Sequence, residues 1–153
     1  MPILPLRQLP DTGSTALLTR WVGALDEQLR DAATDRAVLC RSTLAELAWP
    51  QYAASWATAV EDETLPVATR LALLALDPRN ITLEPEYYAD CDQARFQHVK
   101  PLLWLWYTFD RLPLAGQAVE VGVALRRMLA PHIFRTCGRN FKCFQHVEFS
   151  YGY

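Results

Sequence analysis

The sequence predicts a mainly helical protein that ends in a short β segment. Apolar residues recur every three or four positions through most of the 153 residues, which is the spacing of one helix face, and prolines separate these runs. From Phe141 onward a six-residue spacing replaces the helical one. A hydrophobic fraction of 51% and a charged fraction of 21% are typical of a globular chain. We therefore expect a helical region over residues 1–134 and a separate β part over 135–153.

The helical spacing divides the first region into successive helices. Ser14 or Thr15 can cap the first one, because their hydroxyls accept free backbone N–H groups. Trp49-Pro50 should end the second, since the residue before proline is driven out of helical geometry. Ile81 and Thr82 lie among turn formers, so residues 80–92 should form an extended linker with a short strand. The expected helices lie within residues 13–35, 35–48, 51–62, 65–76, 94–116 and 116–134, with Asp77-Pro78 as the stop after the fourth.

One of these helices has an unusual density of aromatic residues. They cover more than one helix face, so the helix is either buried nearly all round or presents a face to a partner. Burial as a core helix is the favoured interpretation. The alternative makes the chain a self-contained helical interaction module that binds a protein or a hydrophobic ligand through these residues, Trp104, Trp106, Tyr107 and Phe109.

Charge and cysteine content exclude several classes of protein. A formal net charge of −2 gives no general attraction to nucleic acid or to an anionic membrane. The longest apolar run, "PLLWLWYTF", is too short to span a bilayer. No secretory signal is apparent, so four free thiols in the cytoplasm are expected at Cys40, Cys91, Cys137 and Cys143. A basic cluster is better explained as a solvated helix face and turn than as an anion site; it comprises Arg126, Arg127, Arg135, Arg139 and Lys142.

Other possible sites have simpler explanations. The triplet in "DTGST" (residues 11–15) is that of aspartic proteases, but it leads straight into a helix, so capping explains it better. Two acidic groups, Glu61/Asp62/Glu63 and Glu84/Glu86, are more consistent with solvated turns than with cation sites. The only conceivable zinc ligands have spacings that match no common structural zinc pattern; they are His132, Cys137, Cys143 and His146. We therefore expect no metal site.

The six-residue spacing near the end predicts two series of inward-facing side chains. One series is Phe141, Val147 and Tyr153, and the other is Cys137, Cys143 and Phe149. Short strands separated by turns would place both series inside, as in a parallel β-helix. A plain β-hairpin produces a similar alternation, so the pattern alone favours neither fold over the other.

The final residues also resemble a known protein family. "CGRNFKCFQHVEFSYGY" (137–153) resembles the opening of the left-handed β-helix in hexapeptide-repeat acyltransferases, which often begins Cys-Gly-x-Asn-hydrophobic, here residues 137–141. "LDPRNITLEPEYY" and "KPLLWLWYTFDRLPLAG" resemble the helical N-terminal region of a bacterial branch of these enzymes. The resemblance implies a helical region followed by the first, incomplete coil of a left-handed parallel β-helix.

The resemblance also implies an activity. Such enzymes move an acetyl or other acyl group from acyl-CoA, their co-substrate, to a hydroxyl or amine of a small acceptor such as a sugar. They are typically homotrimers, and a β-helix histidine acts as the general base. Only about one coil is present here, so the catalytic and cofactor-binding residues are expected beyond Tyr153 and the chain alone should be inactive. His146 is expected to be a solvated turn residue and not the base.

Overall fold

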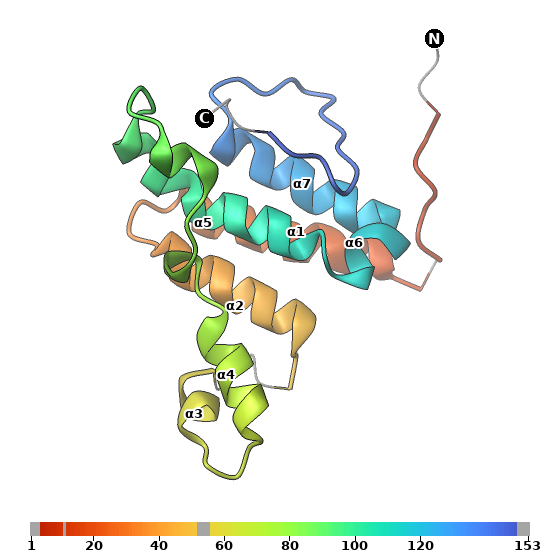
Figure 1. Ribbon diagram of the computed structural model, residues 1–153. Helices are drawn as coiled ribbons and strands as arrows, with labels where there is room; N and C mark the ends of the chain where they lie inside the picture. Colours follow the sequence, from red (N-terminus) through yellow and green to blue (C-terminus); the bar gives the residue numbers. More distant parts are fainter. Residues whose placement is uncertain (1–3, 11, 52–55, 150–153) are drawn as a thin grey trace. The chain divides into compact units, whose positions relative to one another are not determined.

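A computed structural model describes residues 4–10, 12–51 and 56–149, and helices dominate the described chain (Figure 1). No β-strand occurs within these residues. Two 3₁₀ turns, η2 (Pro78–Asn80) and η3 (Glu84–Tyr87), lie between α4 and α5. The α-helices are α1 (Ser14–Arg30), α2 (Arg36–Ala48), α3 (Trp56–Glu61), α4 (Val67–Ala75), α5 (Gln93–Phe109), α6 (Pro113–Gln117) and α7 (Val119–Ile133). The mainly helical fold predicted from the sequence is therefore confirmed.

The chain forms two compact units that are not successive in sequence. The first unit combines Met1–Thr34 with Phe109–Tyr153, and the second is Asp35–Thr108. The C-terminal segment, which we define as residues 135–149, thus belongs to the same unit as α1, α6 and α7. None of the helices in the described part of the chain is long and apolar enough to cross a membrane.

In the first unit, α7 contacts both α1 and α6. The start of α1 differs from the prediction, because the N-cap is Gly13, with a left-handed φ of 77°, and no side chain caps the helix. Ser14 Oγ instead donates to the carbonyl of Pro10 at 2.8 Å. The buried face of α7 contains Val123, Leu125, Met128, Leu129 and Ile133.

In the second unit, hydrogen bonds define both ends of α2 and the start of η3. Asp35 caps α2 by accepting from the backbone N–H groups of Ala37 and Val38. Trp49 ends α2 at the predicted place. The expected strand at Ile81–Thr82 is absent, and a 3₁₀ turn follows, in which Leu83 N–H donates to Glu86 Oε1 at 2.8 Å.

The aromatic helix α5 is a core helix, as favoured from the sequence. Trp104 is 4% exposed, and Trp106 and Phe109 are fully buried. Pro101 lies inside α5. The helix ends at Phe109, where a turn separates it from α6, so the single helix expected over 94–116 is two.

The predicted β segment is not seen in residues 135–149, where turns connect extended stretches. A strand needs a neighbouring strand to pair its backbone groups. Here, side chains take that role: Arg127 Nε donates to the Phe141 carbonyl at 2.9 Å, and Asp110 Oδ2 accepts from His146 N–H at 2.9 Å. This stretch is therefore a loop held on the helical unit and not a hairpin.

Candidate functional site

A buried ion pair joins the end of α5 to α7. Arg126 Nε donates to Asp110 Oδ1 at 2.9 Å, and Arg126 Nη2 also pairs with this oxygen. The Arg126 side chain is 1% exposed and that of Asp110 is 6% exposed. Charges this deep are tolerated only when they are paired and hydrogen-bonded. The guanidinium also lies 5.4 Å from the centre of the Phe109 ring, a cation–π contact.

The same ion pair holds the C-terminal segment. Asp110 uses its second oxygen for His146 N–H, and Arg126 Nη1 donates to the Cys143 carbonyl at 3.5 Å. We call Asp110, Arg126, Cys143 and His146 the anchor. Two side chains of the helical unit thus bind backbone groups of the segment.

Close packing around Arg126 depends on Gly122, which lies one turn before it on α7. A Cβ atom there would lie 2.8 Å from Arg126 Nη1 and would also overlap the carbonyl oxygen of Ala115. A larger residue would therefore force the Ala115 backbone or the Arg126 guanidinium to shift. Gly122 is required by this approach and not by its backbone angles.

Aromatic packing completes the attachment of the segment. The Phe134 ring centre lies 4.8 Å from that of Phe149 and 6.0 Å from that of Phe141. Cys143 is buried, whereas Val147 is 43% exposed. The two series of the six-residue pattern therefore do not both face inward in the described residues, and Tyr153 of the first series lies outside them.

The histidines and acidic residues singled out above are separate from one another. His132 Nε2 lies 2.7 Å from Asp26 Oδ1, while His146 is exposed. Asp62 caps its own turn by accepting from Thr64 N–H at 2.9 Å. Glu86 forms an ion pair with Lys100 at 2.9 Å. No three His, Cys, Asp or Glu side chains in the described residues are placed to hold a metal ion, and Asp11 of the "DTGST" motif lies outside those residues.

The thiols fall into two groups. All four cysteines are free, and Cys40 and Cys143 are buried. Burial raises the pKa of Cys40 to about 12 and also raises the pKa of Cys143. Both are therefore protonated and unreactive at neutral pH. Cys91 and Cys137 are half-buried.

The predicted basic cluster does not form one solvated face. Arg126 is buried in an ion pair with Asp110, so the prediction of a solvated face is wrong for this residue. The signal was in the sequence: Arg126 stands at helical spacing from Val123 and Leu129, on the buried face of α7. Arg127, Arg135, Arg139 and Lys142 are exposed, as expected for a solvated cluster.

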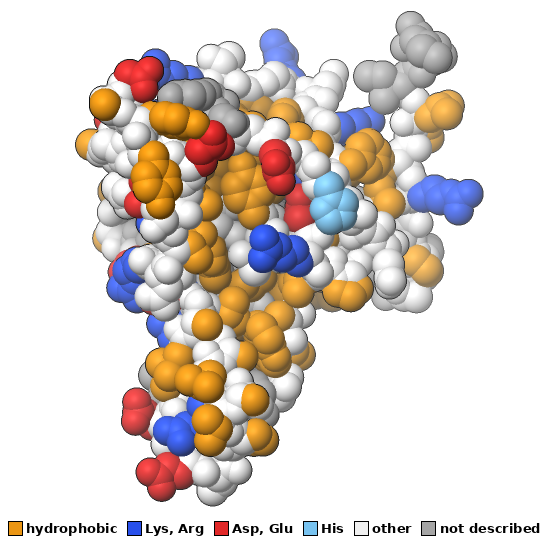
Figure 2. Space-filling view, in the orientation of Figure 1, with side chains coloured by type: hydrophobic (Ala, Val, Ile, Leu, Met, Phe, Trp, Pro, Cys, Tyr) orange, Lys and Arg blue, Asp and Glu red, His pale blue; other side chains and the backbone are white. Residues whose placement is uncertain are grey.

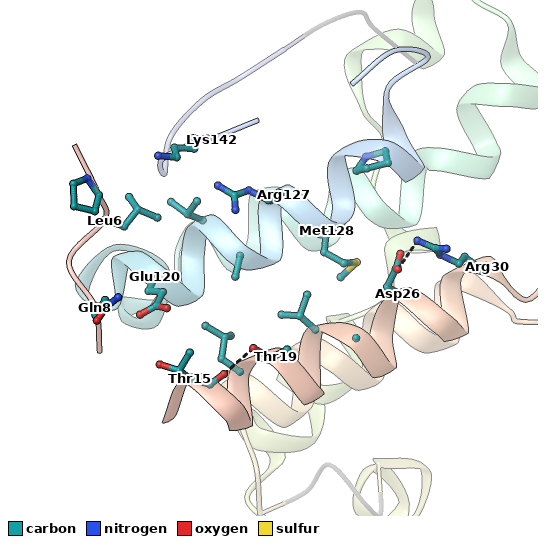
Figure 3. Close-up of a pocket in the computed structure, with 17 residues that line it drawn as sticks. Leu6, Gln8, Thr15, Thr19, Asp26, Arg30, Glu120, Arg127, Met128 and Lys142 are labelled. Carbon is teal, nitrogen blue, oxygen red and sulfur yellow. Dashed lines mark hydrogen bonds and ion pairs between the residues drawn. The ribbon is translucent and has the colours of Figure 1, made fainter. Parts of the chain in front are cut away.

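The first unit also contains an open groove that sequence reasoning missed (Figure 3). Its volume is about 690 Å³, and α1, α7, the N-terminal residues and Lys142 line it. Its apolar lining is Leu6, Leu18, Val22, Val123, Met128 and Pro131. A groove between helices that are distant in sequence has no local signature, so only the packing of α1 on α7 reveals it.

No family model, curated protein or solved structure matches the chain.

Proposed function

We propose that the chain is the helical N-terminal part of a hexapeptide-repeat acyltransferase, and that the C-terminal segment leads into its β-helix. The observation that carries the proposal is the anchor. The segment that resembles the family's first coil is held to the helical unit through its backbone, by the buried Asp110–Arg126 pair. A repeat fold needs such a fixed first turn, because each later coil takes its register from the one before it.

In this proposal the helical unit has a structural role in acyl transfer. The reaction moves an acyl group from the sulfur of acyl-CoA to a hydroxyl or amine of a small acceptor. A base removes the acceptor's proton as the new bond forms, and CoA leaves as a thiol. We assign no described residue to that step, and the chain alone should be inactive. The complete enzyme would act as a homotrimer in the cytoplasm, where its free thiols stay reduced.

The His146 side chain does not meet the requirements of the base. It is exposed, and among the described residues no side chain lies within hydrogen-bond distance of its ring. A general base needs a partner that orients it and a pocket that holds the substrate. Its backbone N–H, by contrast, is a member of the anchor.

The nucleotide sequence after the codon for Tyr153 gives the first test. The proposal expects an in-frame continuation with an aliphatic residue at every sixth position. A stop codon followed by unrelated sequence would contradict it.

The protein encoded by the continuous reading frame gives the second test. With acetyl-CoA and a panel of sugar and amine acceptors, it should release free CoA thiol, measured with a thiol reagent, and it should sediment as a trimer. The 153-residue chain is the matched control and should release none. A continuous frame whose product is monomeric and inactive with every acyl donor would reject the acyltransferase assignment.

A further inference from the structure

The groove between α1 and α7 has the size of a small-molecule site. Its volume of about 690 Å³ falls within the range of about 300–1,000 Å³ that is common for ligand pockets. Along α1 its lining runs from Thr15 to Arg30, which at 1.5 Å per residue is about 22 Å. A site with this shape suits an elongated ligand better than a compact one.

The lining combines an apolar floor with a polar rim. The floor consists of apolar residues that are buried or half-buried, and exposed polar residues also line the groove; the former are Leu18, Val22, Val123 and Met128, and the latter Gln8, Thr15 and Thr19. An apolar floor flanked by hydroxyl and amide groups can cover one hydrocarbon chain.

Three cations and two carboxylates line the groove, so its net charge is positive. Glu120 accepts from Leu9 N–H at 2.8 Å, and Asp26 pairs with Arg30 and His132, both at 2.7 Å. Arg127 and Lys142 are exposed and have no carboxylate partner within the described residues. Figure 3 shows both cations on the α7 side, away from the Asp26–Arg30 pair. An anionic group at this position would be attracted by two cations.

We propose that the groove binds an anionic amphiphile with a single hydrocarbon chain. The chain lies along Leu18, Val22, Val123 and Met128, and the anionic head group is held by Arg127 and Lys142. Each methylene buried on the floor should tighten binding about fourfold. Each exposed cation should contribute about two- to fivefold. The proposal does not depend on the acyltransferase assignment, because it uses no catalytic step, although Lys142 lies in the segment that resembles the first coil.

Methionine labelling gives a site-specific measurement. The chain has two methionines, Met1 and Met128, and Met128 lines the groove. Protein labelled with ¹³C-methyl methionine is titrated with decanoate below its micelle concentration. The Met128 methyl signal should shift and saturate at one decanoate per chain. Octanoate should bind about 15-fold more weakly, because it lacks two methylenes. Uncharged 1-decanol should also bind more weakly than decanoate.

Four variants locate the site on the surface. Lys142→Gln should weaken decanoate binding about two- to fivefold, and Thr19→Trp, a change at an exposed position, should abolish it by filling the groove. The controls are Arg139→Gln, an exposed cation of the same segment, and Leu71→Gln, a 60% exposed residue on α4. Both controls should bind decanoate normally.

Three results would overturn the proposal. The first is a Met128 signal that decanoate does not shift. The second is equal binding of decanoate and 1-decanol, since the cations would then have no role. The third is a dimer that Thr19→Trp dissociates and that binds no decanoate, because the occupant of the groove would then be a second copy of the chain.

Discussion

At the scale of single residues, the stability of the first unit depends on the buried Asp110–Arg126 pair. Replacing Asp110 with Asn leaves the Arg126 guanidinium buried without a counter-charge. Removing one partner of a buried pair costs about 3–5 kcal/mol. We therefore expect Asp110→Asn to lower the free energy of unfolding by about this amount, measured by urea denaturation.

The controls separate the lost charge from general damage. Arg139→Gln, at an exposed position, should change the free energy of unfolding by less than about 0.5 kcal/mol. The double variant Asp110→Leu with Arg126→Met should be more stable than Asp110→Leu alone, because it removes both buried charges together. If the double variant were the less stable of the two, the pair would not be the source of the effect.

His146 is a second residue whose own conformation affects stability, because its backbone is left-handed. Its φ of 61° is left-handed, a conformation that costs a residue with a Cβ about 1–2 kcal/mol. The exposed side chain and the anchor's use of its N–H imply that the backbone, not the imidazole, is needed here. His146→Gly should therefore raise the free energy of unfolding by up to about 1 kcal/mol.

A β-branched residue at the same position tests the cause. His146→Val keeps the N–H that donates to Asp110 but fits a left-handed φ poorly. It should be less stable than the natural protein in the same denaturation measurement. Equal stability of the Gly and Val variants would show that the backbone conformation of residue 146 carries no strain.

At the scale of elements, α4 shows how burial and exposure alternate along one short helix. Leu73 is 1% exposed and packs with Ala59, Val60 and Leu65, whereas Leu74, its neighbour in sequence, is 50% exposed. Val67 and Leu71 are also exposed, and Figure 2 shows hydrophobic side chains at the surface in the region of α4. This helix therefore contributes one central side chain to its small core.

Leu73 and Leu74 form a matched pair for measurement, because they are neighbours in sequence and differ in burial. Leu73→Ala should destabilise the second unit by about 2–4 kcal/mol, because a buried leucine is replaced by a cavity. Leu74→Ala should cost less than about 1 kcal/mol, since half of its side chain already contacts water. Hydrogen exchange of the α3 and α4 amides reports on this unit directly. Similar losses of protection in both variants would contradict the described packing.

The elements also differ in how far their sequence could predict them. Helical spacing and Trp49-Pro50 located α2, and the aromatic density of 104–109 predicted the burial of α5. The break after Phe109 was missed, because Leu112 and Pro113 continue an apolar pattern through a turn. The β segment was predicted but is not seen, because its pattern indicates the faces of a strand and not its backbone partner, and here side chains of α7 and Asp110 bind that backbone.

The candidate sites were less predictable than the helices. Asp110 and Arg126 are 16 residues apart, and no local spacing indicates that they meet. The charge of Arg126 on an apolar helix face was the one usable signal, because a buried arginine requires an acidic partner. The groove depends on α1 and α7, which are about ninety residues apart in sequence, so the arrangement of helices had to be known first.

At the scale of the whole molecule, three carboxylates distributed over both units couple stability to pH. Burial alone would raise the pKa of Asp26, but bonds from His132 and Arg30 outweigh it and lower the pKa. The hydrogen bond from Arg79 lowers the pKa of Asp77. For Glu86, burial is again outweighed, here by Leu83 N–H and Lys100, so that pKa is lowered too.

A carboxylate whose pKa is lower in the folded than in the unfolded protein stabilises the fold at pH values above the unfolded pKa. For Asp and Glu that pKa is about 4. As the pH falls below this value, the unfolded chain binds protons first, and the stabilisation is lost as the pH passes through the lowered pKa values. We therefore expect the free energy of unfolding to be constant with respect to these three groups between pH 5 and pH 7 and to fall below about pH 4.

Asp26→Asn and Glu86→Gln should each flatten this acid limb, the fall in the free energy of unfolding below about pH 4. Glu63→Gln, at an exposed turn position, should leave it unchanged. An acid limb that keeps its slope in the Asp26 and Glu86 variants would mean that other groups cause the loss of stability.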